Sequence, residues 1–194
     1  PMKNSRKSTQ HAIDISEEAG VRYLHFGSEW VQGAMRVARP WSLELAYTRE
    51  MMAGLLLRPA KHWPRNALLI GLGAGSLAKF IYHKLPATRI DVVEIDPQVE
   101  VVARLHFKLP HDPQRLRIHI DDGARFMLAG ETQYDCILVD GFDKNGRAGA
   151  LDTEPFYQAC RARLTTHGLL SVNLLGRSRG FAASKDRIAA AFDD

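Results

Sequence analysis

The most constraining stretch of this chain runs from an apolar strand through a glycine-rich turn and a helix to a second strand that ends in acids. It reads LLIGLGAGSLA at 68–78 and IDVVEID at 90–96. Glycine has no Cβ, so such a turn lets a ligand approach the backbone closely. An acid about 20 residues further on, at the tip of the next strand, is placed to accept hydrogen bonds from a ribose. The stretch therefore predicts an adenosyl-containing ligand.

Strand and helix patterns alternate from residue 67 onward. Apolar runs typical of buried parallel strands occupy 67–71, 89–95, 116–120, 134–139 and 168–174. Helical patterns occupy 76–85, 97–106, 123–128, 154–164 and 181–192. This alternation predicts an α/β fold with a doubly wound, mostly parallel sheet of Rossmann type.

The residues before this alternation follow a different pattern. Short strand patterns at 21–26 and 33–37 predict a small N-terminal β-hairpin, and 43–57 predicts an apolar helix that ends before Pro59.

We expect three parts in the chain. Residues 1–15 form a disordered tail, 16–65 the hairpin and its helix, and 66–194 the α/β domain for the adenosyl-containing ligand. Doubly wound sheets usually continue beyond a fifth strand and one helix, which leaves a C-terminal truncation open.

Composition and charge narrow the class of partner. The chain is 45% hydrophobic and 25% charged, as expected of a globular protein. No apolar run reaches the ~18–20 residues of a membrane span, and the polar start has no secretory signal. We expect a cytoplasmic protein without a membrane partner. The cysteines, Cys136 and Cys160, show no metal-ligand spacing, so we expect no metal.

The net charge of +4 comes from scattered Lys and Arg, whereas residues 94–154 hold 12 acidic and 7 basic side chains. A local negative field favours a cationic substrate over nucleic acid.

Acids follow several of the expected strands, where ligands bind in such sheets. Asp140 and Asp143 follow the fourth strand and are able to face one pocket, bind an ammonium group and accept its proton. A solvated acidic turn is the alternative. We expect Glu94 to accept from a ribose and Asp122 to contact an adenine amino group. The alternative for both is a helix cap.

Taken together, these segments resemble the spermidine synthase (polyamine aminopropyltransferase) family, which has the class I S-adenosylmethionine methyltransferase fold. The resemblance covers about residues 27–174, and it rests on IGLGAG at 70–75, VVEIDP at 92–97, DGARF at 122–126, YDCILVDGFD at 134–143 and LDTEPFY at 151–157.

The resemblance implies roles residue by residue. On the nucleoside side, Glu94 holds the ribose, Asp122 the adenine, and the loop with Gly71, Gly73 and Gly75 the nucleoside backbone. Gln32 lines the same pocket.

On the amine side, Asp140 is the base, Asp143 grips the amine and Tyr47 lines the pocket. The implied donor is decarboxylated or intact S-adenosylmethionine, the acceptor is a polyamine or another amine, and the expected assembly is a homodimer.

One departure bears on the donor. The family usually carries an Asp in the glycine loop, which binds the amino group of the decarboxylated donor, and here Ala74 stands in its place. Loss of that carboxylate is expected to cost on the order of 1.5–3 kcal/mol of donor binding. Aminopropyl transfer is the favoured reaction. Methyl transfer to a small acceptor and a non-catalytic nucleoside-binding homologue are the alternatives.

Overall fold

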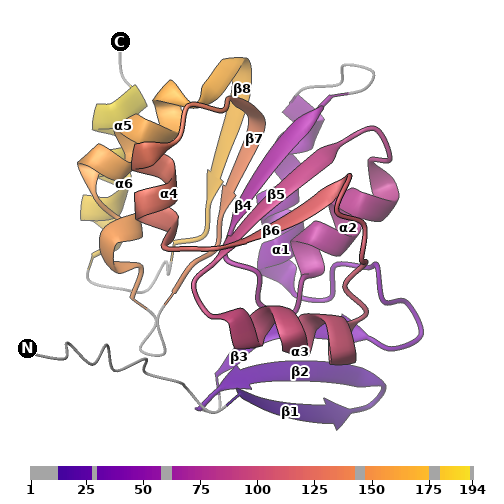
Figure 1. Ribbon diagram of the computed structural model, residues 1–194. Helices are drawn as coiled ribbons and strands as arrows, with labels where there is room; N and C mark the ends of the chain where they lie inside the picture. Colours follow the sequence, from indigo (N-terminus) through magenta and orange to yellow (C-terminus); the bar gives the residue numbers. More distant parts are fainter. Residues whose placement is uncertain (1–12, 28–29, 58–62, 143–146, 175–179, 193–194) are drawn as a thin grey trace, which may run out of the picture.

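The computed structural model describes residues 13–27, 30–57, 63–142, 147–174 and 180–192. Its centre is a five-stranded sheet with helices on both faces (Figure 1). The strands are β4 (Asn66–Ile70), β5 (Arg89–Glu94), β6 (Leu116–Ile120), β7 (Tyr134–Val139) and β8 (Leu164–Val172). They lie in the order β6-β5-β4-β7-β8, and every neighbouring pair is parallel. The predicted doubly wound parallel sheet is confirmed.

The central strand shows why the sheet is covered on both faces. Ala67 and Leu69 of β4 pack into one apolar cluster, and Leu68 and Ile70 pack into another, because successive side chains of a strand point to opposite faces. The first cluster is covered by α1 (Ala46–Met52), α2 (Ser76–Lys84) and α3 (Pro97–Phe107). The second is covered by α4 (Gly123–Ala129), α5 (Glu154–Ala162) and α6 (Phe181–Phe192).

A separate three-stranded antiparallel sheet lies at one end of the large sheet (Figure 1). It consists of β1 (Ile13–Glu18), β2 (Val21–Phe26) and β3 (Val31–Arg36). The expected hairpin corresponds to β2 and β3. The expected disordered tail over 1–15 is wrong for its last three residues, because β1 begins at Ile13 and pairs with β2 along its whole length. Residues 1–12 lie outside the described part of the chain.

The helix expected over 43–57 is shorter in the structure. α1 ends at Met52 and continues as the 3-10 helix η1 (Ala53–Leu57). A Cβ on Gly54 would lie 2.2 Å from Leu169 Cδ2, so this segment packs closely against the Leu169 side chain of β8. The fifth strand also begins earlier than expected, at Leu164.

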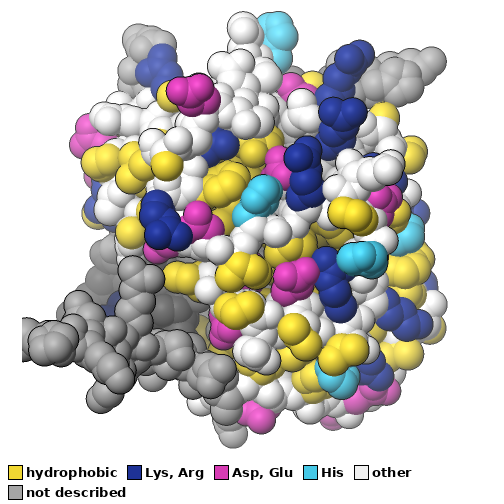
Figure 2. Space-filling model, viewed as in Figure 1, with side chains coloured by type: hydrophobic (Ala, Val, Ile, Leu, Met, Phe, Trp, Pro, Cys, Tyr) yellow, Lys and Arg dark blue, Asp and Glu magenta, His cyan; other side chains and the backbone are white. Residues whose placement is uncertain are grey.

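The surface mixes charges of both signs. On the face shown in Figure 2, Lys and Arg side chains stand in several separate places among acidic, apolar and uncharged groups. No helix in the described part of the chain is both long and apolar enough to cross a membrane.

Candidate active site

The register of the large sheet places several polar residues at one edge. Ile70 of β4 pairs with Val93 of β5 and with Val139 of β7. The residues that follow these three are Gly71, Glu94 and Asp140, so they leave the sheet side by side. This edge is also where the strand order reverses, because the chain moves outward on one side of β4 and then on the other. Ligands bind at such a point in open α/β sheets.

The turn after β4 needs glycine for two reasons. Gly71 has a φ of +96°, and a Cβ there would lie 2.2 Å from the carbonyl oxygen of Asp140. Gly73 has a φ of +51°, and its Cβ would lie 3.2 Å from the carbonyl oxygen of Gln32 on β3. The turn is therefore packed closely against both the end of β7 and the small sheet.

Glu94 joins this turn to the end of β5. Its Oε2 accepts a hydrogen bond from the backbone N–H of Leu72 at 2.9 Å, and its Oε1 accepts one from Asp96 at 3.0 Å. The side chain is 8% exposed. Burial raises the pKa of Glu94, and the backbone N–H groups partly offset that rise. Each oxygen of a carboxylate can accept a further hydrogen bond, so the group is fixed in orientation and still able to accept from a hydroxyl.

The two acids after β6 have different partners. Asp122 is the N-cap of α4, and its Oδ1 accepts from the backbone N–H of Arg125 at 2.9 Å. Asp121 binds the Arg125 guanidinium, with 2.7 Å between Nε and Oδ1, and this bond lowers the pKa of Asp121. Both residues line the cavity described below. Asp122 therefore caps α4, which was the alternative role expected for it, and it also lines the cavity.

Asp140 is held at both of its oxygens. The hydroxyl of Tyr47 on α1 donates to Oδ2 at 3.1 Å, and Nδ2 of Asn173 donates to Oδ1 at 2.9 Å. Burial raises the pKa of Asp140, while the hydrogen bonds from Asn173 and Tyr47 lower it. Burial and the Asp140 charge raise the pKa of Tyr47, so its hydroxyl stays protonated and acts as a donor.

Sequence reasoning missed Asn173. Its signal is its position, because it directly follows β8, and its backbone N–H continues the ladder by donating to Val139 at 2.9 Å. A polar residue that follows the fifth strand lies at the same edge of the sheet as Asp140. The strand-end argument that was applied to the other strands would therefore have identified Asn173 as a candidate.

These elements surround a cavity of about 920 Å³ between the small sheet and the edge of the large one. The predicted residues that line it are Gln32, Tyr47, Gly71, Gly73, Glu94, Asp122 and Asp140. Gly75 is not among the lining residues. It is the N-cap of α2 with a φ of +68°, and a Cβ there would lie 2.9 Å from Leu109 Cδ1, so its role is to start the helix. Asp143 lies outside the described residues.

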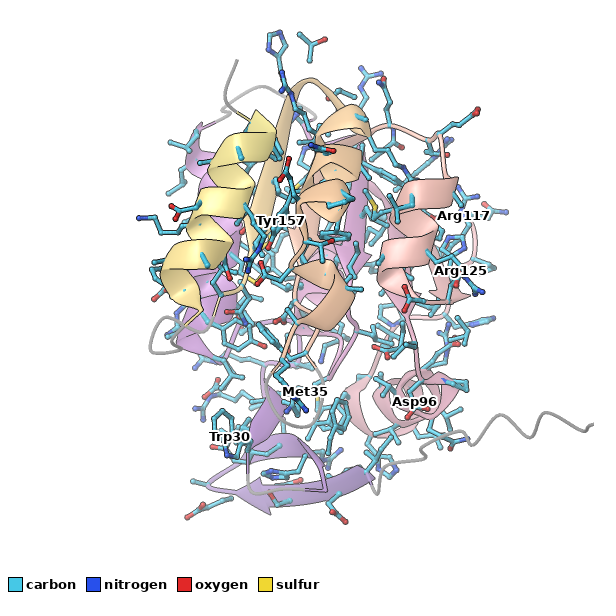
Figure 3. The ribbon with its side chains drawn as sticks, turned by 90° about the vertical axis from the view of Figure 1, so that its left-hand side faces the viewer. Trp30, Met35, Asp96, Arg117, Arg125 and Tyr157 are labelled. Carbon is cyan, nitrogen blue, oxygen red and sulfur yellow. The ribbon has the colours of Figure 1, made fainter. Side chains whose placement is uncertain are left out.

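The wall of the cavity is acidic. Among the described lining residues, the carboxylates are Glu94, Asp96, Asp121, Asp122 and Asp140, and the cationic side chain is Arg147. Trp30, which is 66% exposed, also belongs to the wall. Figure 3 shows Trp30 and Asp96 at the end of the molecule that carries the small sheet. In the described part of the chain, no group of three or more His, Cys, Asp or Glu side chains is arranged to hold a metal ion.

Comparison with known proteins identifies the family of this chain. The family model of the spermine/spermidine synthase domain matches residues 44–173. A polyamine aminopropyltransferase of Neisseria meningitidis is 38% identical over 187 residues, which are 96% of this chain and 70% of that protein. The chain belongs to the spermine/spermidine synthase family.

Solved structures extend the comparison to the fold. A probable spermidine synthase of Corynebacterium glutamicum superposes with a TM-score of 0.71 at 23% identity, covering 82% of this chain and 59% of that one. Human methyltransferase-like protein 13 in complex with SAH gives a TM-score of 0.64 at 28% identity, covering 76% and 71%. The spermidine synthase family and this methyltransferase thus share the fold predicted from the sequence.

Proposed function

We propose that this protein transfers the aminopropyl group of decarboxylated S-adenosylmethionine to putrescine or a related polyamine. The observation that carries the proposal is the carboxylate of Asp140, held by Tyr47 and Asn173 in the same cavity as Glu94 and the glycine turn. A carboxylate fixed at both oxygens beside a nucleoside-type site suits a base that acts on a second substrate. Family membership and the name of the Neisseria relative support the same reaction.

Asp140 has the chemistry that the reaction requires. An alkyl amine has a pKa near the ~10.4 of lysine, so it arrives protonated at neutral pH. Asp140 takes a proton from that ammonium group, and its raised pKa makes it a better acceptor than a solvated aspartate. The freed nitrogen bonds to the methylene carbon beside the sulfonium sulfur, the carbon–sulfur bond breaks, and 5′-methylthioadenosine leaves.

The other groups divide between the two substrates. Glu94 accepts from the ribose hydroxyls, Asp122 contacts the adenine amino group, and Gln32 with Gly71 and Gly73 lines the nucleoside site. This assignment is supported by the fixed orientation of Glu94 and by the shared cavity. The acidic wall attracts a polyamine cation. We assign the grip on the amine to Asp143.

Methyl transfer from intact S-adenosylmethionine is the second candidate, and Ala74 is the observation that favours it. Ala74 is 2% exposed and lines the cavity in the glycine turn. A donor that keeps its carboxylate would be repelled by an acid at this position and is not repelled by alanine. A catalytically silent nucleoside-binding homologue is the third candidate.

One assay separates the three candidates. The protein is incubated with putrescine and either decarboxylated or intact S-adenosylmethionine, and the products are identified by mass spectrometry. We expect spermidine and 5′-methylthioadenosine from the decarboxylated donor. Asp140→Asn keeps the shape but not the base, so turnover should fall ~10²–10⁴-fold while calorimetry shows nearly unchanged binding of methylthioadenosine.

The other outcomes are equally distinct. A methylated amine with S-adenosylhomocysteine establishes the second candidate. Binding of methylthioadenosine without aminopropyl or methyl transfer to putrescine rejects the proposed function and is the result that the third candidate predicts, and Glu94→Ala should then still weaken the binding. Homodimeric assembly, a cytoplasmic location and the absence of nucleic-acid or membrane partners stay predictions.

A further inference from the structure

One wall of the cavity is a short segment that is wedged between two loops of the site. The 3-10 helix η2 (Gly149–Leu151) lines the cavity and ends in Leu151. A Cβ on Gly141 would lie 2.5 Å from Leu151 Cδ1, and one on Gly123 would lie 3.1 Å from Leu151 Cδ2. These two glycines directly follow Asp140 and Asp122. The position of Leu151 therefore limits how far the amine-side loop and the nucleoside-side loop can move toward each other.

The residue after Leu151 is anchored on the side away from the cavity. Asp152 Oδ1 accepts from the Tyr157 hydroxyl on α5 at 2.9 Å, and its Oδ2 accepts from Ser184 Oγ on α6 at 2.7 Å. The guanidinium of Arg187 on α6 also binds Oδ2. Neither Asp152 nor its three partners are among the described residues that line the cavity. Figure 3 shows Tyr157 in the layer formed by α5 and α6.

The carboxylate of Asp152 is charged in this setting. Its burial acts to raise its pKa, but the hydrogen bonds from Arg187, Ser184 and Tyr157 outweigh burial and hold the pKa below its ordinary value. Ser184 is 6% exposed, so its hydroxyl points into the packed layer rather than into solvent. An aspartate with three donors from two helices is held far more rigidly than one on a surface turn.

The backbone carries this anchor directly to the wall. The N–H of Asp152 donates to Gly149 at 3.1 Å, and the N–H of Leu151 donates to Ala148 at 3.1 Å. The helix-anchored carboxylate thus belongs to the residue directly after the leucine that spaces the two loops. If the hydrogen bonds of Asp152 served only to pack α6 onto α5, they would not have to lie next to the cavity wall.

We propose that Asp152 is a positioning residue, which uses Ser184 and Arg187 of α6 to fix Leu151 and so sets the acceptor side of the cavity. Helix α6 then belongs to the site although none of its described residues lines it. This inference rests on the proposed function, because the acceptor side is defined by transfer to an amine.

The test removes the anchor from outside the cavity. Ser184→Ala and Arg187→Met each delete a donor to Asp152 without touching the cavity wall. We expect the apparent KM for putrescine to rise ~10-fold in each, with a smaller fall in kcat. The loss of methylthioadenosine affinity should also be smaller, because Leu151 packs more tightly on the amine-side loop at Gly141 than on the nucleoside-side loop at Gly123. Arg187→Lys keeps a charged donor and should recover part of the loss. The matched control is Gln158→Ala, which deletes an exposed hydrogen bond to Glu154 on α5.

Amide hydrogen exchange measures how firmly Asp152 holds the segment with Leu151, independently of catalysis. The amides of Leu151 and Asp152 should exchange faster in Ser184→Ala and Arg187→Met than in the wild type, and unchanged in Gln158→Ala. Loss of stability spread evenly over α5 and α6, with the KM for putrescine unchanged, would overturn the proposal. If the wild type makes no spermidine, the proposed function fails, and the exchange result still decides whether Asp152 fixes the wall.

Discussion

Two opposing influences act on the carboxyl group of Asp140. Burial raises its pKa, and the hydrogen bonds from Asn173 and Tyr47 lower it without cancelling the rise. As the proposed base, Asp140 must be ionised to accept a proton, so activity should fall as the pH drops through this raised pKa. The position of that acidic limb therefore reports the balance between burial and hydrogen bonding.

Tyr47→Phe should move the acidic limb of the kcat/KM profile to higher pH. The change removes a hydrogen bond that favours the ionised form and leaves the burial in place, so the pKa of Asp140 rises further. Rates measured across the acidic range check this. Tyr82→Phe is the matched control, because it deletes a tyrosine–aspartate bond to Asp112 outside the cavity. An unmoved limb in Tyr47→Phe would show that the titrating base is another group.

Lys79 is a second residue with an unusual environment. Its side chain is 1% exposed, and Nζ donates to the carbonyl of Phe107 at the end of α3 at 2.8 Å. Burial and then the charge of Lys108 lower its pKa from 10.5 to about 7. The unfolded chain binds this proton more tightly than the folded one, so between these two values stability rises with pH.

Lys79→Met should remove this dependence. Between about pH 7 and 10.5, Lys79 is expected to raise the free energy of unfolding of the wild type by up to ~1.4 kcal/mol per pH unit. The stability that is present above 10.5 is thus lost as the pH falls to about 7, and Lys79 adds no further pH dependence below that value. Urea denaturation at pH 6, 8 and 10 measures it. Lys84→Met changes an exposed lysine of the same helix and should keep the wild-type slope. A wild-type slope in Lys79→Met would mean that Lys79 titrates like a solvated amine.

At the scale of elements, the small sheet forms one side of the cavity by packing on the glycine turn. Leu24 of β2, Met35 of β3, Ala74 of the turn and Phe107 of α3 form one buried cluster. A Cβ on Gly33 of β3 would lie 2.6 Å from Ala74 Cβ and 2.9 Å from its backbone nitrogen. The strand and the turn are thus in contact with no room for an added methyl group.

Gly33→Ala should therefore weaken both the fold and the nucleoside site. Inserting a methyl group into a packed contact costs about 1–3 kcal/mol of stability, and displacement of the turn should lower the affinity for methylthioadenosine ~10-fold or more. Thermal unfolding and calorimetry measure the two effects. Gly180→Ala is the control, because a Cβ there meets nothing within 4 Å. Equal behaviour of the two variants would contradict the contact.

At the scale of the whole molecule, the sequence predicted the strands of the large sheet, but it did not predict β1 or the first residues of β8. Runs such as that of β4 are apolar on both faces, which is characteristic of a buried parallel strand. β1 was missed because five of its six residues are exposed, so its order comes from pairing with β2 rather than from its own pattern. The sequence did not predict the early start of β8, because residues 164–167 are mostly polar. A register shift also separates their pairing with β7 from that of the rest of the strand.

Some residues of the site could be predicted from the sequence and others could not. Glu94 and Asp140 follow from strand ends, since parallel strands in register deliver their next residues to one edge. The capping bond of Asp122, the helix-starting role of Gly75 and the grip of Asn173 on Asp140 depend on how distant segments meet. That information lies in tertiary packing and not in local spacing.

The contact between Gly71 and the carbonyl of Asp140 also bears on how this scaffold can diverge. Any side chain at position 71 would push on the backbone of Asp140, the proposed base, so the glycine turn and the end of β7 tolerate little change relative to each other. Substitutions should be tolerated more readily on parts of the cavity wall that are not packed in this way, such as the exposed Trp30. If the proposed function holds, new substrate preferences are expected from exchanges at such exposed positions, while Asp140 and the glycine turn stay unaltered.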